Sequence, residues 1–239
     1  MSLELVYDYL VSPAFFHGAL MTLLITVTSL LFGMVAGLVL ALLQESRLAV
    51  LRVVALAYLW LFRGTPVLFQ IIFIYNVLPG FGIRLSAFLS AVIALSLNEG
   101  AYMAEIIRSG LGAVKKGQRT AGLALGLTRA GVMRYIVLPQ ALRIVLPPVG
   151  NQMIGMLKTS ALVSVVAVQE LLLVANQTAA SNFRYFEALT AAGIYYLLLT
   201  TIFMLGQAWL ERTLDPKRRR QSRTKRPLIE RLIPSAEAR

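Results

Sequence analysis

Two long uncharged stretches constrain this chain more than any other feature of its sequence. Residues 18–43 form a run of 26 residues, and residues 188–210 a run of 23, without any Lys, Arg, Asp or Glu. An α-helix needs about 20 apolar residues to span a bilayer core. Further apolar stretches lie near residues 56–78, 85–107 and 144–175, each interrupted by one or two polar groups. The chain is therefore predicted to be an all-α integral membrane protein with five transmembrane helices.

The composition supports this class and excludes several kinds of site. The chain has 239 residues, of which 58% are hydrophobic and only 14% are charged, which is too apolar for a single soluble core. It contains no cysteine and one histidine, His17, so disulfides, thiolate metal sites and multi-histidine metal or haem sites are not expected. We expect His17 to lie at the mouth of the first helix, and we expect no catalytic or metal site.

The placement of the basic residues predicts the orientation. Nineteen of the 23 basic residues lie in segments 47–52, 108–143 and 212–239, which alternate along the predicted topology. By the positive-inside rule, the N-terminus lies outside and the C-terminus lies in the cytoplasm, which requires an odd number of spans. The first segment carries Glu4 and Asp8 but no basic residue, unlike a signal peptide, so we expect the first helix to be permanent.

This topology divides the chain into three parts. Residues 1–17 are predicted to form a periplasmic N-terminal segment, residues 18–212 the membrane domain and residues 213–239 a basic cytoplasmic tail. A basic run such as residues 217–226 is also typical of nucleic-acid binding. On a membrane protein, contact with anionic lipid explains it at about 1 kcal/mol per basic residue. We therefore expect membrane lipid, and no nucleic acid, as its partner.

The cytoplasmic segment 110–139 is too long and too regular for a simple connection. It contains a short helix that is dense in small and apolar residues and ends at Gly126, after which Thr128 is placed to cap a second helix. The small and apolar positions are Ala121, Leu123, Ala124, Leu125 and Leu127. An exposed helix with this much apolar surface needs a partner. The alternative is that it folds back onto its own subunit.

The same loop resembles the EAA loop of ABC importer permeases. Thr120-Ala121-Gly122 is followed after three residues by Gly126 and, after nine more, by Ile-x-Leu-Pro ending at Pro139. The family has glutamate at the position of Thr120 and alanine at that of Gly122. The resemblance implies that this helix sits in a groove of a separate ATPase subunit and transmits its closure. The residues implied in that coupling are Thr120, Ala121, Gly122, Ala124, Leu125, Gly126 and Leu127.

Six further strings are similar to the polar amino acid branch of these permeases, over roughly residues 18–212. They are 62–70, 98–110, 114–118, 124–127, 138–143 and 147–152. The resemblance implies the type I ABC importer permease fold in the bacterial inner membrane, with a coupling-helix loop between spans three and four. It also implies two ATPase subunits, a second permease chain and a periplasmic solute-binding protein. Whether that second chain is identical or a sister, and which amino acid or opine-like solute is carried, stays open.

The energy source is expected to lie outside this chain. The nearest approach to a phosphate-binding loop is 112–119, but Gln118 and Arg119 stand where a P-loop has Lys and Ser or Thr. We therefore expect ATP and magnesium to be bound by the partner ATPase and no cofactor to be bound here. A gradient-driven secondary transporter is the second hypothesis, and five spans without an internal repeat do not suit it. A membrane-embedded enzyme is the third.

Polar residues inside predicted spans are the candidate cargo site. Span three places Asn98, Tyr102 and Glu105 on one helical face, with Glu99 beside them. For Asn98 and Glu99 the alternative is a hydrogen bond between helices in the permease dimer, and for Glu105 a contact between helices or with the loop is favoured.

Span four is predicted to be a broken helix. It contains Pro139, Pro147, Pro148, Gly150 and Gly155, and irregular backbone at membrane depth is tolerated where it lines a cavity. The candidates beyond the break are Gln152, Thr159 and Ser160. In the family, the position of Thr159 often carries an acidic or amide residue, and Thr-Ser is common where this chain has Ser160-Ala161. Lys158 is expected to snorkel or to pair with a glutamate such as Glu99.

Two glycine-containing motifs are interpreted as structural. Gly33 and Gly37 have the spacing that allows two membrane helices to approach closely. Residues 63–66, Arg-Gly-Thr-Pro, are expected near the cytoplasmic start of span two, where Arg63 snorkels and Thr65-Pro66 shape the helix entry.

Overall fold

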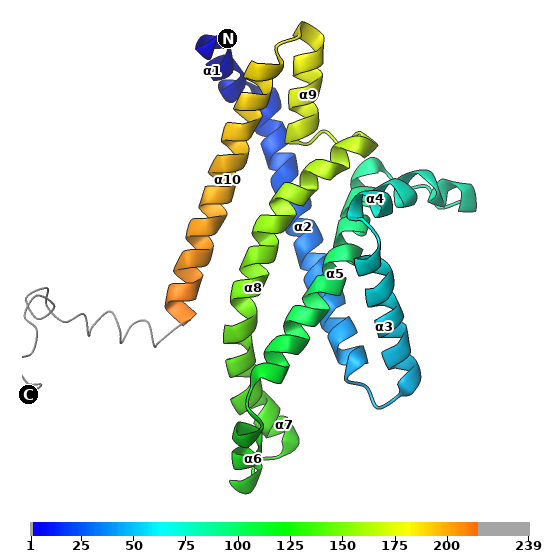
Figure 1. The fold of residues 1–239 in the computed structure, drawn as a ribbon, viewed down its shortest axis with the longest axis vertical. Helices are drawn as coiled ribbons and strands as arrows, with labels where there is room; N and C mark the ends of the chain where they lie inside the picture. The colour runs from blue at the N-terminus through cyan, green and yellow to red at the C-terminus, as the bar shows by residue number, and fades with distance from the viewer. Residues whose placement is uncertain (1, 215–239) are drawn as a thin grey trace, which may run out of the picture.

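A computed structural model of the chain describes residues 2–214, and these residues form a bundle of helices (Figure 1). The elements are α1 (Leu3–Val11), α2 (Pro13–Gln44), α3 (Ala49–Gly64), α4 (Val67–Asn76), η1 (Leu78–Phe81), α5 (Ala87–Ala113), α6 (Lys116–Ala124), α7 (Arg129–Val132), η2 (Met133–Val137), α8 (Leu138–Thr159), η3 (Ser160–Val166), α9 (Leu171–Asn182) and α10 (Tyr185–Leu214). The basic tail predicted from residue 213 onwards lies outside the described residues, apart from its first two positions.

Five membrane spans are present by length and composition within residues 2–214. Four are the helices Pro13–Gln44, Ala87–Ala113 and Tyr185–Thr213 and the combined helix Arg129–Val166. The fifth is the pair α3 and α4, which is bent by 100° at a short break. The predicted all-α fold is therefore confirmed, and the number of spans is the predicted five when the bent pair counts as one, with α1, η1, α6 and α9 as shorter helices outside this count.

Several span boundaries differ from the prediction. The first membrane helix begins at Pro13 rather than Gly18, because Ser12 caps it by accepting a hydrogen bond from Phe15 N. His17 consequently lies inside α2, with Nδ1 2.7 Å from the carbonyl oxygen of Pro13. An apolar window marks where a helix crosses lipid, whereas the helix itself extends through the polar interface at either end.

The largest correction concerns the Arg-Gly-Thr-Pro motif. Arg63 lies in the last turn of α3, about 20 Å along that helix from Ala49, and not near the start of the span. The helix ends there because a residue that precedes proline, here Thr65, is disfavoured in helical conformation. Thr65 is extended (ψ 144°), and the chain turns into α4. The motif therefore creates a bend inside the span.

Span four is also less broken than predicted. Helix α8 continues through Pro147 and Pro148 and ends only at Thr159. Each proline removes one backbone donor, so the carbonyl groups four residues earlier, those of Arg143 and Ile144, lose their partner within the helix. Membrane proteins tolerate such a loss where neighbouring groups compensate, and α10 packs beside this turn, with the Gln207 amide 3.4 Å from the carbonyl oxygen of Pro147. Pro139 is the second residue of α8 and directly follows the π-helical turn η2. The real break follows Thr159, where η3 begins.

Helices α2 and α5 make the closest contact in the bundle, through the glycines that the sequence singled out. A Cβ atom added to Gly37 would lie 2.4 Å from Met103 Cβ and 2.9 Å from Ala104 N. One added to Gly33 would lie 2.7 Å from Glu99 Cβ. These distances are too short for any side chain, so the prediction of close helix packing at both glycines is confirmed.

Replacing Gly37 by alanine is expected to destabilise the bundle. The added methyl group would meet backbone and the stem of Met103, and overpacking of this kind costs about 1–3 kcal/mol. Thermal unfolding in detergent measures the change. Gly193→Ala on α10 is the matched control, because nothing lies within 4 Å of its Cβ position and alanine favours a helix. Equal melting temperatures for the two variants would contradict this account.

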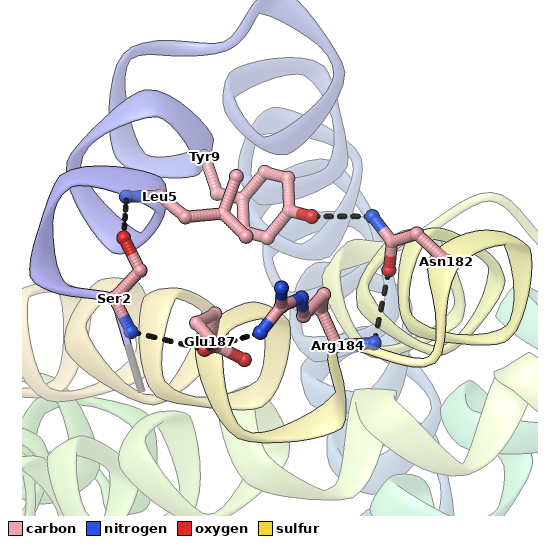
Figure 2. A network of polar contacts seen from close by, with 6 residues as sticks. All are labelled: Ser2, Leu5, Tyr9, Asn182, Arg184 and Glu187. Atoms are coloured by element: carbon pink, nitrogen blue, oxygen red, sulfur yellow. Dashed lines mark hydrogen bonds and ion pairs between the residues drawn. The ribbon is translucent and has the colours of Figure 1, made fainter.

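The short helix α1 is tied to the turn between α9 and α10 (Figure 2). Ser2 N donates to Glu187 Oε1 at 3.1 Å, and Asn182 Nδ2 donates to the Tyr9 hydroxyl at 2.6 Å. Arg184 forms an ion pair with Glu187 at 3.8 Å. Helices α1 and α9 therefore lie at one end of the molecule, opposite the end formed by α6 and α7 (Figure 1).

Candidate functional site

The bend between α3 and α4 is held by two amide side chains. The Gln70 Nε2 atom lies 2.9 Å from the Phe62 carbonyl oxygen, 3.1 Å from that of Thr65 and 2.9 Å from Thr65 Oγ1. Asn98 Nδ2 of α5 donates to Phe62 O at 2.9 Å and to Gln70 Oε1 at 3.2 Å. The carbonyl groups at a helix end inside a membrane need such partners. Asn98 therefore has the interhelical role that was the alternative to cargo binding.

A cavity of about 520 Å³ opens beside this bend, between α3, α4, α5 and α8. We call it the bend cavity. It is lined by Arg63, Gly64, Thr65, Pro66, Val67, Leu95, Asn98, Glu99, Tyr102, Gln152, Gly155, Met156 and Thr159. Four of the five predicted cargo residues, Asn98, Glu99, Gln152 and Thr159, are thus brought together from two helices that are distant in sequence.

Glu99 and Gln152 connect α5 to α8 across the bend cavity. The Gln152 amide nitrogen lies 3.1 Å from Glu99 Oε1 and 3.3 Å from Oε2. The Glu99 side chain is buried, at 4% exposure, because Gly33 of α2 lies directly against its Cβ. Gln152 lies on the continuous helix α8, where Gly155, Met156 and Thr159 share its face. A carboxylate therefore lines the cavity with an uncharged amide as its only described side-chain partner.

The second charged group of the bend cavity is Arg63, which the sequence had assigned a mainly structural role. Its guanidinium pairs with Glu105 and lies 5.5 Å from the ring centroid of Tyr102, a cation–π distance. Glu105 does not line the cavity, which agrees with its expected contact between helices. The sequence does contain a signal for this position of Arg63. Gly64 and Pro66, which follow it within three residues, indicate a helix break rather than a helix entry.

Two residues near the end of α8 do not reach the bend cavity. Ser160 is fully buried, and its hydroxyl donates to the Leu157 carbonyl oxygen at 2.7 Å. The Lys158 side chain is exposed, and Glu99 accepts from Gln152 rather than pairing with Lys158. Thr159 does line the cavity, and its hydroxyl donates to Gly155 O at 3.0 Å. Neighbouring residues on a helix point about 100° apart, so only one of these three faces the cavity.

The predicted coupling loop forms two short helices at the far end of the molecule (Figure 1). Helix α6 ends at Ala124, and Gly126 follows it in the left-handed conformation (φ +85°). The Thr128 hydroxyl then caps α7 by accepting a hydrogen bond from Gly131 N at 3.1 Å. The end at glycine and the cap at threonine are both confirmed.

The two interpretations of the loop apply to different sides of α6, and the structure shows one of them, the packing of the loop onto its own chain. Gly122 is buried, and a Cβ there would lie 2.5 Å from Ile136 Cδ1 and 3.0 Å from Val132 Cγ2. The opposite face carries the exposed side chains Thr120, Ala121, Leu123, Ala124 and Leu125. Leu125 is 84% exposed, an unusual position for leucine in an aqueous loop. The loop therefore packs on itself through Gly122 and presents a second, small and apolar surface.

Comparison with known proteins agrees with these features. The family model for the binding-protein-dependent transport system inner membrane component matches residues 29–216. The arginine transport system permease protein ArgU of Corynebacterium glutamicum is 41% identical over 86% of this chain and 69% of its own length. The glutamine transport system permease protein GlnP of Escherichia coli strain K12 is 41% identical over 84% of this chain and 92% of its own length.

Solved structures show the same fold. A crystal structure of an amino acid ABC transporter with histidines superposes with a TM-score of 0.83 and 38% identity, over 89% of this chain and 100% of that chain. The MetNI methionine ABC transporter superposes with a TM-score of 0.73 at 19% identity, over 90% of this chain and 100% of that chain, and shows the fold alone. The five-span bundle and the exposed loop helix agree with the family match over residues 29–216. The chain therefore belongs to the family of binding-protein-dependent transport system inner membrane components.

Proposed function

We propose that the chain is the permease subunit of an ATP-driven importer, and that it carries polar amino acids through the bend cavity. The observation that carries this proposal is the pair of opposite charges in one cavity, Glu99 on α5 and Arg63 on α3. An α-amino acid is a zwitterion, so it needs an anionic and a cationic contact at the same time. A volume of about 520 Å³ lies within the usual range for small-ligand sites.

Both charges have partners that a cargo can replace. The cargo ammonium group would take the place of the Gln152 amide beside Glu99, and the cargo carboxylate would compete with Glu105 for Arg63. Gln152 and Thr159 would then contact the side chain of the cargo, with Asn98 fixing the wall of the cavity at the bend. Ser160 is left out of the proposed site because its hydroxyl is buried away from the cavity. The relatives named for arginine and glutamine transport support a polar cargo.

The proposed partners follow from the two ends of the molecule. Separate ATPase subunits would bind the exposed face of α6, and their closure would pull on α5 and α8 through the loop. The N-terminus would lie outside and the C-terminus in the cytoplasm, so that a solute-binding protein meets the end formed by α1 and α9 (Figure 1). A second permease chain would complete the pathway.

Reconstitution tests this function. The full chain is placed in proteoliposomes with candidate ATPase, permease and binding-protein subunits, and uptake of labelled arginine and glutamine is measured in separate experiments. We expect uptake that requires ATP, and ATP hydrolysis that requires this chain. Uptake by this chain alone, driven by a proton or sodium gradient without any ATPase, would contradict the proposal and favour a secondary transporter.

A further inference from the structure

The segment between α8 and α9 separates the bend cavity from the end of the molecule where α1 and α9 lie. After η3 the chain turns at Ala167, which has a positive φ of 59°. This conformation is unfavourable for a residue with a side chain, so it persists only where the surroundings hold it. Segment 160–170 is therefore fixed by contacts rather than by its own backbone preference.

Three valines of this segment form an apolar plug, which we call the valine plug. Val163, Val166 and Val168 are all buried in one cluster with residues of α2, α4, α5 and α8. Leu95 and Met156 belong to the same cluster and also line the bend cavity. The valine plug is therefore continuous with the cavity wall, through Leu95 and Met156.

A buried carboxylate holds the end of the segment. Glu170 is completely buried and caps α9, with Oε1 accepting from Leu173 N at 2.8 Å. Its other oxygen, Oε2, accepts from the Tyr196 hydroxyl of α10 at 2.9 Å and lies 3.4 Å from Thr22 Oγ1 of α2. Thr22 Oγ1 in turn accepts from Leu171 N at 3.2 Å. One side chain thus joins the start of α9 to two membrane helices.

A helix cap alone does not require this arrangement. A serine or aspartate caps a helix from the surface, whereas a buried glutamate loses its hydration and needs several donors to compensate. Here the close donors come from α9 and α10, next to the strained turn at Ala167, while Thr22 Oγ1 of α2, which also donates to Gly18 O at 3.0 Å, lies 3.4 Å from Glu170 Oε2. A Cβ on Gly18 would lie 3.1 Å from Leu171 Cα, so α2 and α9 also touch through backbone.

We propose that Glu170 is a positioning residue that holds the valine plug closed, with Thr22 and Tyr196 as its partners. Together these three side chains form a latch. Opening of the cavity towards the α9 side then requires segment 160–170 to move, with Ser160 and Glu170 at its two ends and the turn at Ala167 between them. The closure itself is a property of the chain without cargo. The inference rests on the proposed transport function only for the statement that the latch controls the passage of cargo.

Cysteine labelling tests the latch directly. The full chain contains no cysteine, so Val163→Cys introduces a single thiol into the valine plug. A water-soluble, membrane-impermeant maleimide is added to spheroplasts that contain the assembled transporter, and the rate of labelling reports how often the plug opens. Tyr196→Phe removes a hydrogen bond to the Glu170 carboxylate, and Thr22→Val leaves the buried Leu171 N at the start of α9 without its acceptor, so we expect each to raise the rate about tenfold.

Two neighbouring residues provide matched controls. Tyr195→Phe also removes a buried hydroxyl from α10, but that hydroxyl donates to Leu10 O of α1 and not to Glu170. Thr26→Val removes a buried hydroxyl from α2 that donates only to its own helix, at Thr22 O. We expect both to label at the rate of Val163→Cys alone. Equal increases in controls and latch variants would overturn the proposal, as would no increase in the latch variants.

A double-mutant cycle separates a latch from general loosening. Glu170→Gln keeps one carbonyl oxygen for Leu173 N but lacks the second acceptor for Tyr196. In a latch, Glu170→Gln and Tyr196→Phe remove the same contact, so the double variant labels no faster than either single variant. If the increases in labelling rate of the two single variants multiply in the double variant, the proposal is overturned. Labelling needs no cargo, so failed amino acid uptake with this labelling pattern would contradict the proposed function and leave the latch intact.

Discussion

Glu99→Gln is expected to lower amino acid uptake about a hundredfold while the chain remains assembled in the membrane. Glutamine has almost the same shape, and its amide oxygen still accepts from Gln152 Nε2, so the contact between α5 and α8 survives. Only the negative charge is removed. Loss of one partner from a buried charge pair costs about 2–5 kcal/mol, and a hundredfold corresponds to the lower half of that range.

The initial rate of uptake of labelled arginine or glutamine into proteoliposomes measures this effect, and co-purification of the other subunits measures assembly. Glu45→Gln is the matched control, because Glu45 is an exposed carboxylate in the α2–α3 turn with a loose 3.9 Å ion pair to Arg108. Exposed pairs of this kind contribute little, so its uptake should be unchanged. If Glu99→Gln takes up amino acids at the rate of this control, Glu99 has no role in cargo binding and serves only as a structural contact between helices.

The uniform parts of the fold were predictable, because one physical rule decides them. The helices α2 and α10 contain the two long uncharged stretches, and a helix satisfies all the backbone groups of such a stretch in lipid within the segment itself. The close approach at Gly33 and Gly37 was predictable for a similar reason, since only glycine leaves room for two backbones at that distance.

The parts that failed depend on neighbours that a local pattern does not contain. Pro147 and Pro148 break a helix in isolation, but α8 continues through both of them where it packs against α10. The bend at Thr65 was missed because a hydropathy window averages across it. Gln70, which holds the bend, was passed over as one polar residue in an apolar stretch.

The candidate site was predicted in its members but not in its geometry. Polar residues within spans identified Asn98, Glu99, Gln152 and Thr159, because burial of such groups is costly without a function. Their convergence on one cavity depends on how α5 and α8 cross. Ser160 directly follows Thr159, and α8 ends between the two residues. Their side chains therefore point in different directions, and only that of Thr159 faces the cavity.

Ala121→Glu on α6 is expected to abolish ATP-driven uptake without removing the chain from the membrane. Ala121 is exposed on the face of α6 that Gly122 leaves free, so a glutamate there does not disturb the packing of the loop on Val132 and Ile136. A longer, charged side chain would hold the two surfaces apart in a close-fitting contact with an ATPase subunit. We expect the co-purified ATPase to fall at least about tenfold, as for loss of a central contact in an interface.

Ala130→Glu is the matched control, because it is the same substitution at an exposed position of α7 in the same loop. It adds the same negative charge to the surface of the same loop, so a general effect of charge on assembly would appear in both variants. Retained uptake and ATPase binding in Ala130→Glu, with loss of both in Ala121→Glu, would assign the coupling surface to α6. Normal ATPase binding and transport in Ala121→Glu would refute that assignment, and the exposed Leu125 would then need another partner.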